Sequence, residues 1–121
     1  MKPVGIHHVN LMFDDIDAAR EFYAGVMGFD EIERPDFGFP GLWFQMGAQQ
    51  LHMQPGKAPD SFQHFALEVD DMDAALAHLK ARGIEPSWGP LKRPDYARAE
   101  IRDPDGNPIE LRQWLAKKPQ Q

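Results

Sequence analysis

Four side chains in this sequence carry metal-binding groups at positions related by an internal repeat. The segment HVNLMFDDIDAA starts at His8, the segment HFALEVDDMDAA starts at His64, and seven of their twelve positions are identical. A weaker match aligns QLHMQ with PIELR and places His52 over Glu110. Imidazole and carboxylate groups are ligands for Zn²⁺, Ni²⁺, Mn²⁺, Co²⁺ and Fe²⁺. The repeat therefore predicts a divalent metal site formed by these four residues.

Strand alternation leaves a second interpretation of the histidines open. Alternate residues of a strand share a face, so Val9 and Leu11 point to one side while His8 and Asn10 point to the other. The second face is polar in both copies of the repeat, and such a face can carry histidines only because it meets water. The repeat-related placement of four donor groups favours the metal over this alternative.

Each copy of the repeat predicts the same order of elements, βαβββ. Asp14 or Asp15 can cap the first helix, and a glycine follows each helical stretch. Hydrophobic periodicity and turn residues predict strands near 6–13, 29–34, 41–46 and 49–54 with a helix over 16–27, then strands near 63–69, 84–88, 96–102 and 108–114 with a helix over 71–82. We expect an α+β fold of two βαβββ modules related by a pseudo-twofold axis, with mixed sheets curved into a cup and the helices outside.

The whole chain is expected to form a single domain. The first module spans about 5–54, a Pro- and Gly-containing linker covers 55–61, and the second module spans about 62–114. The tail at 115–121 has no hydrophobic pattern and is expected to fray.

Composition excludes several functional classes. The chain has 121 residues, with 13 Lys and Arg against 19 Asp and Glu, giving a net charge of −6. An acidic chain without a basic run is a poor match to nucleic acid or an anionic membrane surface, so neither partner is expected. Because there is no cysteine, disulfides, thiolate metal sites and cysteine nucleophiles are excluded, and a cytoplasmic location is expected.

A set of short motifs then resembles one known superfamily. The resemblance covers residues 5 to about 114 and lies in His8 ahead of Asp15, Glu21-Phe22-Tyr23, Gly28-Phe29, Leu51-His52, His64, Asp70, Asp103-Pro104-Asp105-Gly106-Asn107 and Ile109-Glu110-Leu111. This pattern resembles the vicinal oxygen chelate superfamily, which includes glyoxalase I, fosfomycin-resistance enzymes, bleomycin-binding proteins and extradiol dioxygenases.

The resemblance implies a metal-dependent function. The family's ligand positions fall on His8, His52, His64 and Glu110, and three of them, without His52, suffice in many members. It also implies a homodimer and a small substrate that chelates the metal through two neighbouring oxygens. A thiol co-substrate is compatible with it. Glu110 is the expected general base, and the leading expectation is a lyase or isomerase of the glyoxalase type.

Two departures from the family patterns leave other functions open. Bacterial glyoxalase I typically follows its second ligand with a Leu-Thr-aromatic-Asn-Trp-Gly run, where this chain has His52-Met53-Gln54-Pro55-Gly56. The potassium-binding loop of glutathione-dependent fosfomycin enzymes is replaced by Leu91-Lys92-Arg93-Pro94-Asp95-Tyr96. A small-molecule binding or resistance protein without catalysis, and a dioxygenase-type activity, therefore remain alternatives. The metal, the substrate and any sharing of sites between chains stay unassigned.

Further side chains on the polar face are expected to bind substrate. If Gly47-Ala48 is a two-residue turn, Trp43 lies across from His52, although a core tryptophan would follow the same pattern. If Arg102 pairs with Pro108 across the turn at 103–107, Arg98 opposes Arg112 and Glu100 opposes Glu110. The two arginines then suit an anionic substrate group or, as the alternative, balance the charges of Glu100 and Glu68. The expected substrate-binding residues are Asn10, Trp43, Arg98, Glu100 and Arg112.

Two neighbours of the metal ligands receive structural roles. His7 is adjacent to His8, so alternation predicts that it points to the opposite face. Gln50 lies two residues before His52 and is expected to orient an imidazole.

Overall fold

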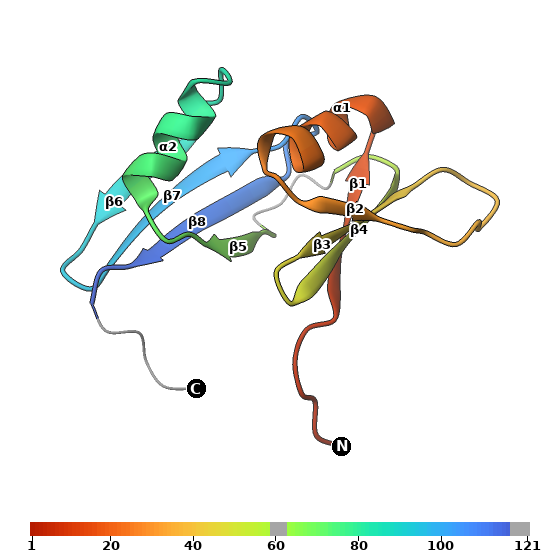
Figure 1. The fold of residues 1–121 in the computed structure, drawn as a ribbon, viewed down its shortest axis with the longest axis horizontal. Helices are drawn as coiled ribbons and strands as arrows, with labels where there is room; N and C mark the ends of the chain where they lie inside the picture. The colour runs from red at the N-terminus through yellow and green to blue at the C-terminus, as the bar shows by residue number, and fades with distance from the viewer. Residues whose placement is uncertain (59–62, 117–121) are drawn as a thin grey trace. The chain divides into compact units, whose positions relative to one another are not determined.

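The computed structural model describes residues 1–58 and 63–116, which divide into two compact units. Unit 1 takes 1–58 and Pro104–Gly106, and unit 2 takes 63–103 and 107–116. Each unit holds one four-stranded mixed sheet and one helical segment between its first two strands, as Figure 1 shows. The α+β class and the two βαβββ modules predicted from the repeat are thus observed.

Unit 1 is a sheet in the order β1-β4-β3-β2, formed by β1 His8–Phe13, β2 Asp30–Ile32, β3 Leu42–Met46 and β4 Gln49–Pro55. β1 pairs with β4 in parallel, and the other pairs are antiparallel. Gly47 and Ala48 form the predicted turn between β3 and β4, and Gly47 adopts a φ of 59°. Its core includes Phe13, Leu42, Phe44, Leu51 and Met53.

The helix expected over 16–27 is not a single α-helix. Asp15 caps α1 Ile16–Arg20, and a π-helical segment, η1 Glu21–Val26, follows directly. The N–H of Met27 donates to the carbonyl of Phe22 at 2.8 Å, five residues back. Consecutive side chains point about 100° apart in an α-helix and closer together in the wider π-helical turn. The wider turn lets Phe22 and Tyr23 both be buried, at 5% and 0% exposure.

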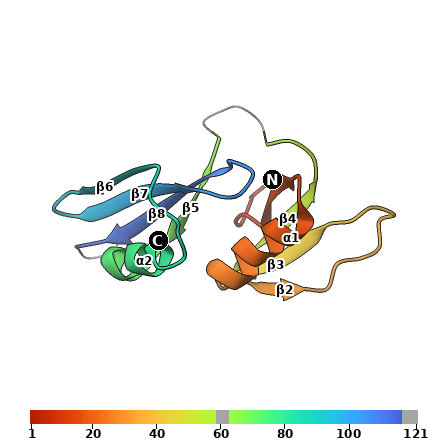
Figure 2. The same cartoon turned by 90° about the horizontal axis from the view of Figure 1, so that it is seen from above.

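Unit 2 repeats this arrangement with the strand order β5-β8-β7-β6. Its elements are β5 Phe65–Glu68, α2 Met72–Lys80, β6 Trp88–Lys92, β7 Tyr96–Arg102 and β8 Pro108–Trp114. Asp71, the repeat partner of Asp15, caps α2 by accepting the Ala74 N–H at 3.0 Å. Figure 2 shows α2 against one face of this sheet, where Met72 and Leu79 are buried.

The strand predicted at 84–88 is wrong, because β6 begins only at Trp88. The dipeptide Gly89-Pro90 is typical of the end of a strand, since proline lacks the N–H that a central strand needs. β6 is an edge strand, however, and an edge tolerates proline on its unpaired side. The register to β7 shifts between Trp88 and Leu91, which accommodates the irregular dipeptide.

The turn at 103–107 closes the last hairpin by hydrogen bonds within itself. The backbone N–H and the side-chain amide of Asn107 donate to Asp103 Oδ1 and Oδ2, at 2.8 and 2.7 Å. Both side chains are buried, and Gly106 adopts a φ of 85°. The turn therefore sets the predicted register, in which Arg102 pairs with Pro108.

The chain segments outside the modules are only partly covered by the described residues. Of the linker expected at 55–61, positions 59–61 lie outside them, and Pro55 is the last residue of β4. Of the tail expected to fray at 115–121, positions 117–121 lie outside them, and the Leu115 N–H donates to the Asp95 carbonyl at 2.9 Å. No helix in the described parts of the chain is long and apolar enough to cross a membrane.

Candidate functional site

In unit 1, three flat side chains form a stack on the polar strand face. The His52 ring lies 4.0 Å from the Trp43 ring at an interplanar angle of 4°, and 3.9 Å from the His8 ring at 17°. Trp43 and His52 are cross-strand partners in β3 and β4, as predicted from the Gly47-Ala48 turn. His52 is consequently buried at 9% exposure although it belongs to the polar face.

The covering of His52 also determines its protonation. Burial lowers the pKa of His52 from its usual value of 6.5, and the nearby positive charges of His8, His7 and Arg34 lower it further. Its Nε2 lies 2.8 Å from Gln50 Oε1, an atom that can only accept. In the neutral ring the proton is therefore on Nε2, and the lone pair available to a ligand is on Nδ1. Gln50 makes the contact to the imidazole that the sequence predicts.

The prediction that His7 points away from His8 is wrong. β1 begins at His8, so the strand alternation does not extend back to His7. The two Nδ1 atoms lie 2.9 Å apart, and the His7 ring is 6.3 Å from the His52 ring. His7 is exposed and belongs to the same histidine group as His8 and His52.

An aromatic loop extends beyond this stack. Phe37 and Phe39 are about half exposed, with their rings 6.1 Å apart. The Arg34 guanidinium lies 4.8 and 4.9 Å from these rings and donates to the Phe39 carbonyl at 3.0 Å. Phe37 also lies 6.2 Å from Trp43, so an exposed aromatic surface continues from the loop to the stack.

In unit 2, the corresponding residues are His64 and Glu110. His64 Nε2 lies 3.6 Å from Glu110 Oε1, close enough for an ion pair when the histidine is protonated. The Glu110 side chain is only 15% exposed, whereas His64 is 44% exposed. β8 positions Glu110 opposite Ala66 of β5 and Glu100 of β7.

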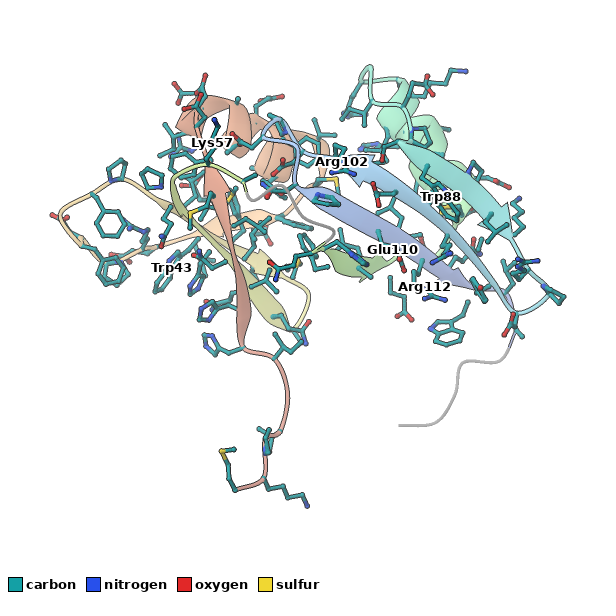
Figure 3. All side chains as sticks on the ribbon, turned by 180° about the vertical axis from the view of Figure 1, so that it is seen from behind. Trp43, Lys57, Trp88, Arg102, Glu110 and Arg112 are labelled. Carbon is teal, nitrogen blue, oxygen red and sulfur yellow. The ribbon has the colours of Figure 1, made fainter. Side chains whose placement is uncertain are left out.

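Two arginines lie beside the Glu110 carboxylate. Arg98 Nη1 is 3.8 Å from Oε1, and Arg112 Nη1 is 3.4 Å from Oε2. Each guanidinium also lies over an aromatic ring, Arg98 over Trp88 at 4.7 Å and Arg112 over Tyr96 at 4.6 Å. Figure 3 labels Glu110 and Arg112 next to each other along β8, with Trp88 in the same unit.

The arginines do not balance Glu100, which was one of the two sequence-based interpretations. Arg102 Nη2 lies 3.0 Å from Glu100 Oε1, and the Ser87 hydroxyl donates to the same carboxylate oxygen at 3.0 Å. Within the described residues, the carboxylate that Arg98 and Arg112 contact is Glu110 in both cases. The predicted opposition of Arg98 to Arg112 and of Glu100 to Glu110 is confirmed by the register of β7 and β8.

The two pairs of candidate ligands occupy equivalent positions in their units. Val9 pairs with Leu51 in unit 1, and Phe65 pairs with Ile109 in unit 2. These pairs are related by the same sequence offsets that relate His8 to His64 and His52 to Glu110. The equivalence inferred from a weak sequence repeat is therefore also an equivalence of strand register.

No group of three or more histidine, aspartate or glutamate side chains able to hold a metal ion occurs among residues 1–58 and 63–116. Each unit by itself brings two of the predicted ligands together. Imidazole nitrogen and carboxylate oxygen are nonetheless the donors that suit borderline divalent ions, and one of each type is adjacent in unit 2. The donor chemistry fits the expected metal.

The sequence did not single out Trp88 and Tyr96 as supports of the two arginines. Tyr96 and Trp88 stack on the arginines, and Arg34 stacks on the loop phenylalanines. Trp88 was missed because the sequence predicted a strand at 84–88, which would end at the residue where β6 begins. Alternation within β7 places Tyr96 on the same face as Arg98, which was the available signal for that residue.

Comparison with known proteins then identifies the family. Residues 5–111 match the model of the Glyoxalase/Bleomycin resistance protein/Dioxygenase superfamily. The chain belongs to this superfamily.

Several known proteins resemble the chain along most of its length. A protein of Vibrio parahaemolyticus, named probable lactoylglutathione lyase, is 30% identical over 121 residues, covering 88% of each chain. A crystal structure from Bacillus anthracis, assigned to the glyoxalase family, has a TM-score of 0.83 at 31% identity and covers 94% of this chain and 98% of that one. TnmS3, an antibiotic binding protein from Streptomyces sp. CB03234, has a TM-score of 0.80 at 28% identity and covers 94% and 98%.

Proposed function

We propose that this protein is a divalent-metal-dependent enzyme of the glyoxalase type, a lyase or isomerase acting on a small substrate. The observation that supports this most is the equivalent strand register of the two ligand pairs, His8 with His52 and His64 with Glu110. A similarity of 30% to a probable lactoylglutathione lyase points to the same class. The proposed metal ligands are these four residues, and the ion is Zn²⁺, Ni²⁺, Mn²⁺, Co²⁺ or Fe²⁺.

The metal would polarise two neighbouring oxygens of a bound substrate and stabilise the negative charge that develops on them. The chain's own contribution to the chemistry is proton transfer by Glu110. Its carboxylate would remove a proton from a hydroxyl-bearing carbon and return it to the adjacent carbonyl carbon, while the hydroxyl proton passes to the former carbonyl oxygen. The two transfers together isomerise an α-hydroxy carbonyl without an oxidant or reductant. His64 Nε2 lies 3.6 Å from this carboxylate, which supports a shared site for the two residues.

Substrate contacts are proposed on both units. Trp43 offers a flat apolar surface beside the His52 ring, and Asn10 lies opposite His52 in the register of β1 and β4. Glu100, Arg98 and Arg112 lie around Glu110 in unit 2. A thiol co-substrate is part of the proposal only for the lactoylglutathione-lyase type of reaction.

Metal binding is the first test, since every version of this function requires it. Protein made without a chelating tag and stripped of metal is titrated with each of the five ions, and bound metal and melting temperature are measured. His64→Ala should lose both metal and turnover, Glu110→Gln should keep more metal but lose proton transfer, and His52→Gln should be the mildest. His78→Ala is the matched control, because His78 lies on α2 beside Arg82 and outside the proposed set.

Turnover is measured on adducts of α-keto aldehydes with thiols, then on fosfomycin and catechols. Absence of metal binding by the wild-type protein would refute the proposal. So would a Glu110→Gln variant that turns over like the parent, or a His52→Gln variant that loses metal as fully as His64→Ala.

A second candidate is a small-molecule binding or resistance protein without catalysis. It is favoured by the aromatic surface of Phe37, Phe39 and Trp43, and by the similarity to an antibiotic binding protein. This function predicts tight binding of a flat apolar ligand with no dependence on metal. A dioxygenase-type activity is distinguished by a requirement for Fe²⁺ or Mn²⁺ together with oxygen.

A homodimer is also proposed, because the family resemblance implies one and a second chain could complete the substrate site. Unit 2 exposes Trp88, Trp114 and Leu115 at 41–45%. Light scattering should give twice the 13.8 kDa chain mass. A monomer at all concentrations would exclude the dimer.

A further inference from the structure

Arg98 and Arg112 reach the Glu110 carboxylate without using their full hydrogen-bonding capacity. Their distances of 3.8 and 3.4 Å exceed the 2.7–2.9 Å that is typical of a direct charged hydrogen bond. Arg98 Nε is shielded from solvent, and no group among the described residues accepts its hydrogen. Both guanidiniums therefore have N–H groups that could donate hydrogen bonds to a ligand.

The aromatic supports leave the edges of the guanidiniums available. Trp88 and Tyr96 each cover one guanidinium at 4.7 and 4.6 Å. Stacking takes the flat face of a guanidinium, whereas its N–H donors lie in the plane and at the edge. This arrangement holds the two planar guanidiniums in position beside the Glu110 carboxylate.

Glu68 lies opposite Arg112 in the register of β5 and β8, so charged side chains of both signs surround Glu110. Two guanidiniums contact its single carboxylate, and Glu100 across the strand is already paired with Arg102. Beside Arg98 lies an open hollow of about 230 Å³, whose other charged or titratable lining residues are His64, Glu100 and Glu110, while Arg112 lines a separate hollow with Tyr96.

We infer that Arg98 and Arg112 form a carboxylate-binding clamp for the substrate, and that a divalent cation on Glu110 releases the clamp for this role. The inference rests on the proposed function and adds to it the substrate class, a small carboxylate-bearing molecule. With Glu110 engaged by the cation, both arginines lose their carboxylate partner and turn their donors to the ligand. Because coupling between two binding sites is reciprocal, cation and carboxylate each strengthen the binding of the other.

The same geometry predicts opposite effects of one substitution on the two ligands. Arg98→Gln or Arg112→Gln removes a donor from the clamp, so carboxylate binding should weaken about tenfold. It also removes a positive charge close to Glu110. A divalent ion and a unit charge about 6 Å apart repel enough, even at the dielectric constant of water, for Zn²⁺ to bind about tenfold more tightly in the variant.

The experiment compares these variants with Arg102→Gln, an arginine of the same strand that pairs with Glu100 instead. Propionate is titrated into metal-free protein while the ¹H–¹⁵N signals of the arginine Nε–H and tryptophan indole groups are followed by NMR. Propionamide is the uncharged probe of the same shape, and methylphosphonate tests whether the clamp prefers a tetrahedral anion. The titrations are repeated with saturating Zn²⁺, and the affinity for Zn²⁺ is measured separately by calorimetry.

Propionate should shift the Arg98 Nε–H and Trp88 signals in the wild-type protein, and propionamide should not. Arg98→Gln and Arg112→Gln should weaken propionate and strengthen Zn²⁺, and Arg102→Gln should have a clearly smaller effect on both, because Arg102 contacts Glu100 and not Glu110. The inference is overturned if the three variants behave alike, or if methylphosphonate binds and propionate does not. It is also overturned if Zn²⁺ increases propionate affinity equally in Arg98→Gln, which would indicate direct coordination of propionate. Failure of Zn²⁺ to bind wild-type protein would overturn the proposed function, and the metal-free titration then decides the clamp by itself.

Discussion

Replacing Glu110 by glutamine should destabilise the metal-free protein, because one carboxylate neutralises two guanidiniums. The amide keeps the size and shape of the side chain but removes the charge that Arg98 and Arg112 face at 3.8 and 3.4 Å. Unit charges about 4 Å apart attract by about 4 kcal/mol at an effective dielectric constant of 20. The arginine side chains are 37% and 41% exposed, however, so screening and ordering costs reduce each pair to about 1 kcal/mol.

The expected loss in unfolding free energy for Glu110→Gln is therefore about 1–2 kcal/mol. Unfolding a chain of 121 residues carries an entropy near 0.25 kcal/mol/K, so the melting temperature should fall by about 4–8 °C. The assay is thermal and urea unfolding in a chelating buffer, at low and at high salt. Salt should reduce the difference, because screening weakens attractions between partly exposed charges.

Glu100→Gln is the matched control for this measurement. Glu100 lies directly opposite Glu110 in the register and contacts one arginine, Arg102, at 3.0 Å with both side chains more exposed. It should cost about 1 kcal/mol or less. The electrostatic reasoning fails if Glu110→Gln costs no more than Glu100→Gln, or if the difference is independent of salt.

Three further outcomes follow from the structure. Burial lowers the pKa of His52 in the folded chain, so the unfolded chain binds more protons below pH 6.5 and stability should fall as the pH drops below that value. In unfolding curves measured at several pH values, His52→Gln should lessen this pH dependence, and an unchanged dependence would argue against the lowered pKa. Trp43→Leu uncovers one face of His52, so NMR titration should show its pKa rising towards 6.5, and a fall would contradict the stacking. Gly106→Ala places a side chain at a φ of 85°, and no atom beyond its chain neighbours lies within 4 Å of the new Cβ. Backbone strain alone should therefore lower the free energy of unfolding by about 1 kcal/mol, and Gly106→Asn should lower it less in the same urea unfolding assay.

Local features of the fold could be predicted from the sequence, because local residues specify them. The repeat places Asp15 and Asp71 before the two helical segments, and each caps its helix. Alternation assigned Leu51 and Ile109 to the core face, and both are fully buried. Short turns set the registers that bring Trp43 opposite His52 and Glu100 opposite Glu110, since a fixed loop length leaves one pairing.

Where prediction failed, the decisive interaction was with a residue distant in sequence. Whether Pro90 ends a strand depends on the strand being at the sheet edge, which the local pattern does not encode. The π-helical segment buries Phe22 and Tyr23 together, and the core that covers them comes from other parts of the chain. The position of His7 depends on where pairing with β4 begins.

For the candidate site, the sequence determined which donor and charged groups exist and which strand face each one occupies. The structure decided their partners. The sequence offered Glu100 or Glu68 as partners for Arg98 and Arg112, whereas the folded sheet directs both guanidiniums to Glu110 and supports them on aromatic rings. The physical reason is that strand register fixes a residue's face and row, while its long side chain selects a partner from the charges and rings that neighbouring strands bring within reach.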